Sequence, residues 1–209
     1  MQPWSLVVPA KLLSRAKTRL APLTAQAPEI PHADLVLALL GDTVAAAVAS
    51  PLVRDLVVVT DDPRAAAVVT GLGARTVADE PDAGLNPALV HGARSTGRHR
   101  VAALSSDVAA LRPAELSAAL EQAEGHPRSL VADAEGTGTT LLAVTTGPLD
   151  PRFGPGSAQA HVASGAVPLT GGWPGLRRDV DTAADLAAAA ALGLGPRSAP
   201  LAARLLGTR

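Results

Sequence analysis

The sequence predicts an α/β fold in which a mostly parallel sheet is covered by helices on both faces. Short apolar runs alternate along the chain with longer Ala-rich segments. Several of these runs are apolar throughout, as is typical of strands buried on both faces of a sheet. Regular β–α alternation favours this layered arrangement. Because no repeat or composition break divides the chain, we expect a single domain spanning residues 1–209.

The elements follow from local patterns. Pro113 suits a first helical position, and Gly71 suits a helix end. The segments between 10 and 30 and between 147 and 156 are long for loops of a compact domain, which indicates function. The expected strands are Ser5–Val8, Asp55–Thr60, Ala74–Val77, Val101–Leu104, Ser129–Ala132, Thr139–Val144 and Leu176–Val180, and the expected helices are Asp34–Ala49, Pro63–Gly71, Asn86–Ser95, Pro113–Ala123 and Thr182–Leu192.

The composition excludes several classes of function. Trp4, Trp173 and Phe153 are the only aromatic residues, and the net charge is -1. A nucleic-acid surface needs aromatic platforms or a basic patch, so we expect no nucleic-acid partner. The chain has no cysteine, which rules out disulfides and thiolate metal sites. It also lacks a long apolar span and a signal-peptide pattern at its start, so we expect a cytoplasmic protein with no membrane partner.

Polar residues follow several of the predicted strands. Lys11 comes after the first strand, Asp61 and Asp62 after the second, and Ser106 and Asp107 after the fourth. In open α/β sheets, ligands bind beyond the carboxyl ends of the strands. The expected site is therefore assembled from loops that are distant in the sequence.

Asp179 and Asp181 form the most informative pair in the chain. If the run before the helix is extended, residues i and i+2 point to the same face, and the two carboxylates lie side by side. Adjacent like charges cost free energy unless a cation lies between them, and oxygen ligands suit Mg²⁺. Taken alone, the same position also fits an N-cap of the helix that follows.

A basic loop follows the first strand and carries Lys11, Arg15, Lys17 and Arg19. Clustered cations can neutralise a triphosphate and stabilise a pyrophosphate leaving group. The same spacing also fits a solvated basic helix face. Neither a Walker sequence nor a Gly-x-Gly-x-x-Gly motif is present, so P-loop and dinucleotide-binding functions are disfavoured.

Five motifs together resemble a known family. They are Lys11–Leu20, Asp107-x-x-x-Leu111-Arg112-Pro113-x-Glu115-Leu116, Gly136–Leu142, Arg152–Ser157 and Leu176–Thr182. In this order and spacing they resemble the phosphoenolpyruvate and 2-phospho-L-lactate guanylyltransferases of deazaflavin coenzyme (factor 420) biosynthesis. The resemblance covers nearly the whole chain. It implies a three-layer, Rossmann-like nucleotidyltransferase fold and transfer of GMP from GTP to the phosphate of a three-carbon acid.

The resemblance also implies roles for individual residues. Bacterial members resemble phosphoenolpyruvate enzymes and archaeal ones 2-phospholactate enzymes, and nothing in the loops separates the two acids. The implied roles are Mg²⁺ ligands for Asp107, Asp179 and Asp181, binding of the acceptor carboxylate for Thr139, Gly154 and Ser157, screening of charge for Lys11, Lys17 and Arg19, and contact with the nucleotide for Lys11, Gly84 and Asn86.

Elementary chemistry agrees with these roles. A phosphate monoester, with a second pKa of about 6, is already a dianionic nucleophile at neutral pH. The difficulty is to bring two anions together, which metal ions and the basic loop would ease. The Gly-rich turns at Gly138 and Gly154 offer N–H donors to an anion, although such turns also serve simple chain reversal.

Several points stay open at this stage. Asn86 could contact the nucleotide or cap the helix that follows it. His161, four residues after Ser157, could face the substrate, but a helix-surface position is the favoured interpretation. Ser106 replaces a Gly of the family pattern, and strain would follow if that position required φ > 0.

Three further possibilities concern the protein as a whole. A non-catalytic nucleotide-binding protein of the same fold is the alternative from a different class, and retention of the three aspartates argues against it. Ala-rich helices fit either a monomer or a homodimer. The resemblance alone suggests that a labile diphosphate product is passed to a downstream transferase.

Overall fold

A computed structural model describes residues 3–13, 16–80, 82–97 and 99–207. Its centre is a seven-stranded sheet with the order β3-β2-β1-β4-β6-β5-β7. The strands are β1 Trp4–Pro9, β2 Val53–Val59, β3 Arg75–Val77, β4 Val101–Leu104, β5 Arg128–Ala132, β6 Thr139–Val144 and β7 Val167–Pro168. The mostly parallel sheet expected from the sequence is confirmed.

One strand of the sheet is reversed. β6 pairs antiparallel with both β4 and β5, whereas the β1–β2, β1–β4, β2–β3 and β5–β7 pairs are parallel. The start of β6 therefore lies at the same edge of the sheet as the carboxyl ends of β4 and β5: Leu141 pairs with Leu104, and Thr139 pairs with Ala132. This reversal brings a turn between two strands to the edge where ligands bind.

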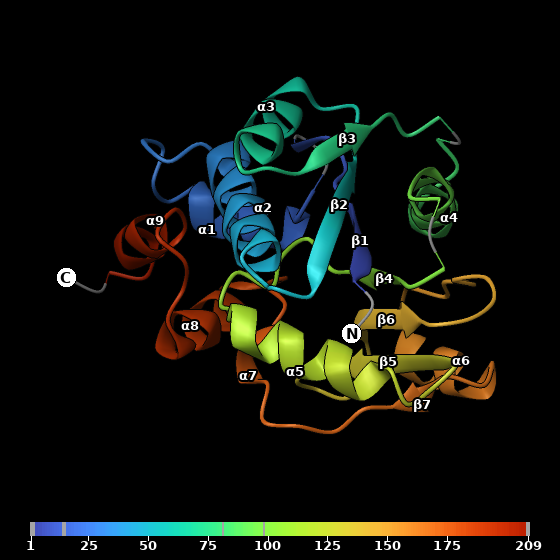
Figure 1. Ribbon diagram of the computed structural model, residues 1–209. Coiled ribbons are helices and arrows are strands. Elements are labelled where there is room, and N and C mark those ends of the chain that lie inside the picture. Colours follow the sequence, from blue (N-terminus) through green and yellow to red (C-terminus); the bar gives the residue numbers. More distant parts are fainter. Residues whose placement is uncertain (1–2, 14–15, 81, 98, 208–209) are drawn as a thin grey trace.

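Helices cover both faces of the sheet (Figure 1). α2, α3 and α5 pack on one face, and α4 and α6 pack on the other. Side chains alternate accordingly along β1, with Leu6 and Val8 in one core cluster and Val7 in the other. The helices are α1 Ala21–Thr24, α2 His32–Val48, α3 Pro63–Gly71, α4 Leu85–Ser95, α5 Pro113–Ala123, α6 Ser157–Ala163, α7 Pro174–Arg177, α8 Ala183–Leu192 and α9 Ala199–Leu205, with a 3-10 turn η2 at Thr18–Leu20.

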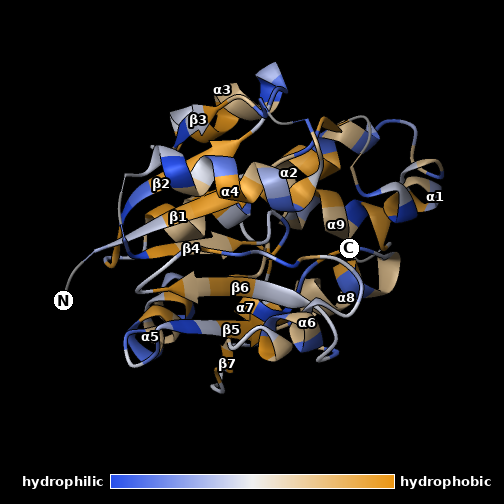
Figure 2. Ribbon diagram, turned by 90° about the vertical axis from the view of Figure 1, so that its right-hand side faces the viewer, coloured by the Kyte–Doolittle hydropathy of each residue, from blue (hydrophilic) through white to orange (hydrophobic). Residues whose placement is uncertain are grey.

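A third core cluster joins α2 to the two C-terminal helices. Leu35 and Leu39 of α2 pack there with Leu186 of α8 and Ala202 of α9. Figure 2 shows hydrophobic segments gathered along the sheet and in the helices packed against it. Burying a side chain such as Leu39 contributes roughly 1.5–3 kcal/mol, so this cluster anchors the C-terminal helices firmly. No helix among the described residues is long and apolar enough to cross a membrane.

Most predicted elements are confirmed, with one error and several omissions. Leu176–Val180 was expected to be a strand; instead α7 ends at Arg177, and irregular backbone leads to α8. Two N–H groups at the start of α7, those of Gly175 and Leu176, donate to the carboxylate of Glu115 in α5. This contact between distant segments favours a helical turn over an edge strand, and no local pattern reveals it. The short elements η2, α1, α6, β7 and α9 were not predicted.

Candidate active site

A cavity of about 670 Å³ opens at the carboxyl edge of the sheet. It is bordered by the loops after β1 and β4, the β5–β6 turn, the loop before α6 and the segment before α8. All predicted site residues except Gly84 and Asn86 line it: Lys11, Lys17, Arg19, Asp107, Thr139, Gly154, Ser157, Asp179 and Asp181. The structure thus brings together most of the residues singled out in the sequence. Arg15, the fourth cation of the basic loop, lies outside the described residues.

Lys17 lies between two of the three predicted metal ligands. Its ammonium contacts one carboxylate oxygen of Asp107 and, at 2.5 Å, one of Asp181. Lys17 has a left-handed backbone, with φ of 54°, which is uncommon for a residue other than glycine. Such conformations cluster at functional sites, where the surroundings hold them in place. A cation from the protein itself therefore lies between two carboxylates, but the pair is Asp107 and Asp181, not the predicted pair of Asp179 and Asp181.

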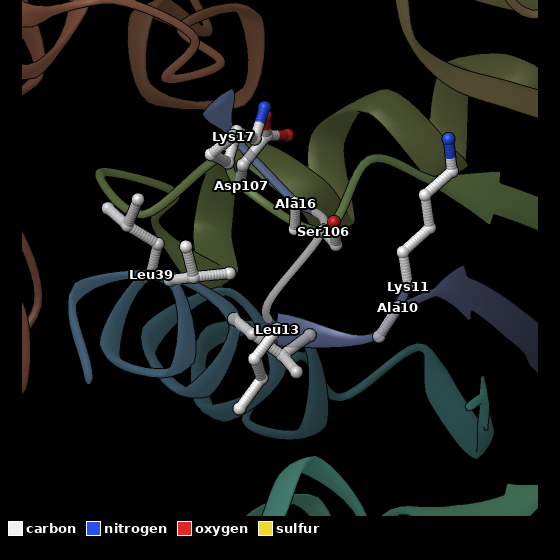
Figure 3. Close-up of a pocket in the computed structure, with 10 residues that line it drawn as sticks. Ala10, Lys11, Leu13, Ala16, Lys17, Leu39, Ser106 and Asp107 are labelled. Atoms are coloured by element: carbon white, nitrogen blue, oxygen red, sulfur yellow. The ribbon is translucent and has the colours of Figure 1, made fainter. Parts of the chain in front are cut away.

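The basic loop does not act as one cluster. Figure 3 shows the Lys17 ammonium beside Asp107, whereas Lys11 extends away from that pair. The small cavity drawn there, next to Leu13 and Leu39, has a volume of about 30 Å³. That is room for about one or two water molecules, which is too small for a nucleotide. Arg19 lines the larger cavity and is exposed.

Asp179 faces a different set of acidic groups. Oxygen atoms of Asp179, Asp133 and Glu135 lie within 4.8 Å of one another. Burial above all, and then the negative charges of Asp181 and Asp133, raise the pKa of Asp179 to about 6, against the opposing effects of a backbone hydrogen bond and Lys17. A carboxylate held among like charges is the electrostatic condition that a divalent cation relieves. The oxygen donors present therefore fit Mg²⁺.

Asp133 is a site residue that the sequence interpretation missed. It is buried, and its two oxygens accept the backbone N–H groups of Thr137 and Gly138 at 2.8 Å and 2.6 Å. A Cβ on Gly138 would lie 2.3 Å from one of these oxygens, so only glycine allows this close approach. Asp133 directly follows a predicted strand, as Asp107 nearly does, and that position is the signal that could have identified it.

Another part of the cavity is built around Thr139. Its hydroxyl lies 2.9 Å from Nδ1 of His161 and accepts a hydrogen bond of 3.3 Å from Ser157. Thr139, Ser157 and His161 are all buried. The favoured expectation of a helix-surface position for His161 was wrong, because α6 turns this face toward the Arg152–Ser157 loop. Because α6 was not predicted, no sequence pattern indicated which of its faces would be buried.

Two side chains hold that loop in place. Nε2 of His161 accepts the N–H of Arg152 at 2.8 Å, and the His161 ring meets the Phe153 ring edge-on with centroids 5.1 Å apart. The Asn86 side chain accepts from the N–H of Phe153 at 2.8 Å and donates to its carbonyl at 3.1 Å. Gly84, not Asn86, is the N-cap of α4. The capping alternative for Asn86 is therefore wrong, and its amide supports the loop beside the cavity.

The concern about Ser106 is also resolved. Positive φ angles among the described non-glycine residues occur at Lys17, Asp82 and Asp150. Ser106 is not among them, so replacing a glycine there requires no left-handed backbone. The left-handed backbone in this region is instead at Lys17, whose side chain contacts Asp107.

The fold and the site define a class of protein. The structure resembles a nucleotidyl transferase from Methanothermobacter with a TM-score of 0.62, at 20% identity over 100% of both chains. It also resembles a cytidylyltransferase from Leptospira borgpetersenii with a TM-score of 0.58, at 11% identity over 95% of this chain and 90% of the other. At these identities the likeness establishes the fold, which is that of the nucleotidyltransferases.

Sequence comparison gives the family. Residues 4–166 match the model described as guanylyl transferase CofC like, and the chain belongs to that family. It is 64% identical over 200 residues to a phosphoenolpyruvate guanylyltransferase of Geodermatophilus obscurus, covering 95% of this chain and 93% of that one. It is 57% identical over 204 residues to another from Salinispora arenicola, covering 96% and 94%. The protein is accordingly a nucleotidyltransferase.

Proposed function

We propose that this protein transfers GMP from GTP to phosphoenolpyruvate, as part of deazaflavin coenzyme biosynthesis, with residues 1–209 acting as one domain. The observation that carries the proposal is the cavity that combines Lys17, four aspartates and the Thr139–Ser157 pair. Relatives that share more than half of its residues over nearly the whole chain bear the name of this activity. The products are enolpyruvyl-diphosphoguanosine and pyrophosphate.

The reaction requires little acid–base chemistry. A phosphate oxygen of phosphoenolpyruvate forms a bond to the α-phosphorus of GTP. The bond from that phosphorus to the α,β-bridging oxygen breaks, and pyrophosphate leaves with the electron pair. Because the attacking phosphate is already ionised, the protein needs chiefly to align two anions and to offset their repulsion.

The carboxylates of Asp107, Asp179 and Asp181 would hold Mg²⁺. Lys17 contacts one oxygen of Asp107 and one of Asp181, which leaves the second oxygen of each for another cation. When bound, the metal supplies positive charge that stabilises the phosphates in the transition state. Lys17 keeps the aspartates from repelling one another, while Lys11 and Arg19 face the incoming triphosphate from the same loop.

A second cavity is the proposed site for the guanine base. It has a volume of about 280 Å³ and shares Pro9, Lys11 and Leu85 with the larger cavity. Asp61, Asp79 and Gly84 also line it. One carboxylate oxygen of Asp79 is buried and has no hydrogen-bond donor among the described residues. Guanine presents N–H donors on its Watson–Crick edge, and a carboxylate accepts them.

Replacing Asp79 by Asn tests this assignment. The variant turns an acceptor into a donor, so the preference for GTP over ATP, measured as the ratio of kcat/KM values, should fall about tenfold or more. Asp62 supplies the matched control, because it caps α3 through Arg64 and Ala65 and does not line the cavity. Asp62→Asn should leave the ratio unchanged. An unchanged ratio in Asp79→Asn would place base selection elsewhere.

The reaction itself is tested by pyrophosphate release from GTP and Mg²⁺. The assay compares phosphoenolpyruvate, 2-phospholactate and a control without acceptor. Release that depends on phosphoenolpyruvate supports the proposal. Release with 2-phospholactate alone would replace the substrate while keeping the site. A folded, GTP-binding protein that releases pyrophosphate with neither would support a non-catalytic role.

A further inference from the structure

His161 makes two hydrogen bonds that together determine where its proton lies. The side chain is fully buried, with 0% exposure. Its Nε2 is 2.8 Å from the backbone N of Arg152, and its Nδ1 is 2.9 Å from the hydroxyl oxygen of Thr139. A backbone N–H can only donate, so Nε2 must be the acceptor. In a neutral ring the proton is then on Nδ1, and it points at Thr139.

The surroundings keep the ring neutral. Burial above all, and the positive charges of Arg128 and Arg152, lower the pKa of His161 to about 4, against the opposing effects of Asp150 and a backbone hydrogen bond with Ser157. The ring also packs edge-on against Phe153. The imidazole therefore remains a neutral Nδ1–H donor throughout the physiological pH range.

The consequence concerns two hydroxyl groups. Thr139 and Ser157 are hydrogen-bonded to each other at 3.3 Å, and this contact uses one of their two O–H protons. With Nδ1 as a donor, Thr139 gives no proton to the ring, so one O–H remains for a ligand. With the opposite tautomer, Nδ1 would accept the Thr139 proton, and the pair would have none to offer.

We propose that His161 is a positioning residue that commits the Thr139–Ser157 pair to donate one O–H to an anionic acceptor in the cavity. That the acceptor is the carboxylate of phosphoenolpyruvate rests on the proposed function. The hydrogen bond from the Arg152 N–H to Nε2 places the ring proton on Nδ1, and Nδ1 then donates that proton to Thr139. The same bond anchors the Arg152–Ser157 loop, so loop position and hydroxyl direction are set by one side chain.

The tautomer can be measured without any turnover. Long-range ¹H–¹⁵N NMR spectra of the ¹⁵N-labelled protein at pH 7 distinguish a protonated ring nitrogen from an unprotonated one. The chain has five histidines, and the His161 signals are those lost in His161→Asn. We expect protonated Nδ1 and unprotonated Nε2. Protonated Nε2, or a doubly protonated ring, would overturn the proposal whatever the enzyme does.

Two substitutions separate hydroxyl positioning from loop support. Asn places its amide where Nδ1 lies, and so keeps a donor to Thr139 while losing the acceptor for Arg152. Gln reaches the position of Nε2, and so keeps that acceptor while losing the donor. The KM for phosphoenolpyruvate should rise about tenfold or more in His161→Gln and less than about threefold in His161→Asn, while the KM for GTP stays within about twofold in both.

Thr139 provides a check on the same mechanism. Thr139→Ser keeps the hydroxyl and should remain sensitive to His161→Gln. Thr139→Val removes the hydroxyl, and adding His161→Gln to it should then raise the KM little further, because the two changes remove one interaction. Additive effects, or KM values that follow the thermal stabilities of the variants, would indicate a merely structural His161.

Failure of this proposal is distinguishable from failure of the proposed function. If the wild-type protein does not use phosphoenolpyruvate, the function fails, and the NMR result still decides the tautomer. If the wild-type protein does use it and His161→Gln leaves its KM unchanged, the function stands and the positioning role is overturned.

Discussion

At the scale of single residues, the candidate site contains side chains and backbone conformations that cost stability but suit the binding of a cation or substrate. Asp179 is partly buried beside two other carboxylates, an arrangement that costs stability but suits a cation. Lys17 has a left-handed backbone conformation, and its ammonium contacts Asp107 and Asp181. Residues that serve function in this way are not at their stability optimum.

Asp179→Asn tests this trade-off. Removing one of several neighbouring negative charges should leave the thermal midpoint unchanged or raise it, because relief of burial and of repulsion from Asp181 and Asp133 offsets the lost attraction of Lys17. Turnover should fall at least about 100-fold, because a proposed metal ligand is weakened. Pyrophosphate release and a thermal melt measure the two effects. Mg²⁺-dependent activity close to wild type would remove Asp179 from the metal site.

A second residue-scale prediction concerns pH. The pKa of His161 falls from 6.5 to about 4 on folding, so between these values the unfolded chain binds a proton that the folded one does not. The contribution of neutral His161 to the free energy of unfolding is therefore fully present above pH 6.5. It is lost as the pH falls toward 4, and this loss is at most about 3 kcal/mol. Charges facing the ring are those of Arg128, Asp150 and Arg152.

Urea unfolding from pH 4 to 8 measures this dependence. His161→Asn should lose the part of the slope that belongs to this ring. His99 is exposed, and His99→Asn serves as the matched control that should keep the slope. Equal slopes in all three proteins would show that folding does not lower the pKa of His161.

At the scale of elements, the start of α8 connects helix formation to the site. Thr182 and Asp185 form a capping box, and the Asp185 carboxylate also accepts the N–H of Asp181 at 3.3 Å. The cap therefore helps to orient one of the proposed metal ligands. The N-cap role considered for the aspartates belongs to their neighbour Thr182.

Thr182→Ala should lower the free energy of unfolding by about 1 kcal/mol, since it leaves the Asp185 N–H without its side-chain acceptor. It should also weaken the apparent affinity for Mg²⁺, because Asp181 loses part of its support. Thr182→Ser keeps the hydroxyl and should resemble wild type in both measurements. A stability loss with unchanged Mg²⁺ dependence would separate the cap from the site.

At the scale of the whole molecule, the C-terminal segment is fastened to α2 by a buried carboxylate. Asp42 is 3% exposed and accepts from the backbone N–H of Arg197, and from both the N–H and the hydroxyl of Ser198 at 2.7 Å and 2.6 Å. Gly195 allows this approach, since a Cβ there would lie 2.4 Å from the carboxyl carbon. α8, which follows Asp179 and Asp181, leads directly into this segment.

Asp42→Ala should therefore destabilise the protein by roughly 3 kcal/mol, because several donors lose a buried charged acceptor. Amide hydrogen exchange should rise first in residues 193–205. Asp34→Ala is the control on the same helix: its pair with Arg64 is exposed, and its loss should cost about 1 kcal/mol or less. Similar losses of unfolding free energy in both variants would argue against an anchoring role for Asp42.

Local patterns reveal much of this architecture. Strands such as β4 are continuous apolar runs, and α3 and α5 begin at proline, so their bounds can be predicted. The short elements α6, α7 and β7 depend on contacts such as that between Glu115 and Gly175, which no local pattern encodes. The residues of the candidate site were predicted mainly from a resemblance, and their roles remain proposals.

The order of the main strands and helices, and the loops that carry Lys11 and Asp107, were determined by the sequence itself, because hydrophobic period and punctuation are local properties. Tertiary structure alone decided which charges meet. The reversed β6 brings Thr139 to the ligand edge, Lys17 reaches between Asp107 and Asp181, and α6 buries His161. Each of these depends on residues far apart in the chain, and their contact energies exist only once the sheet has formed.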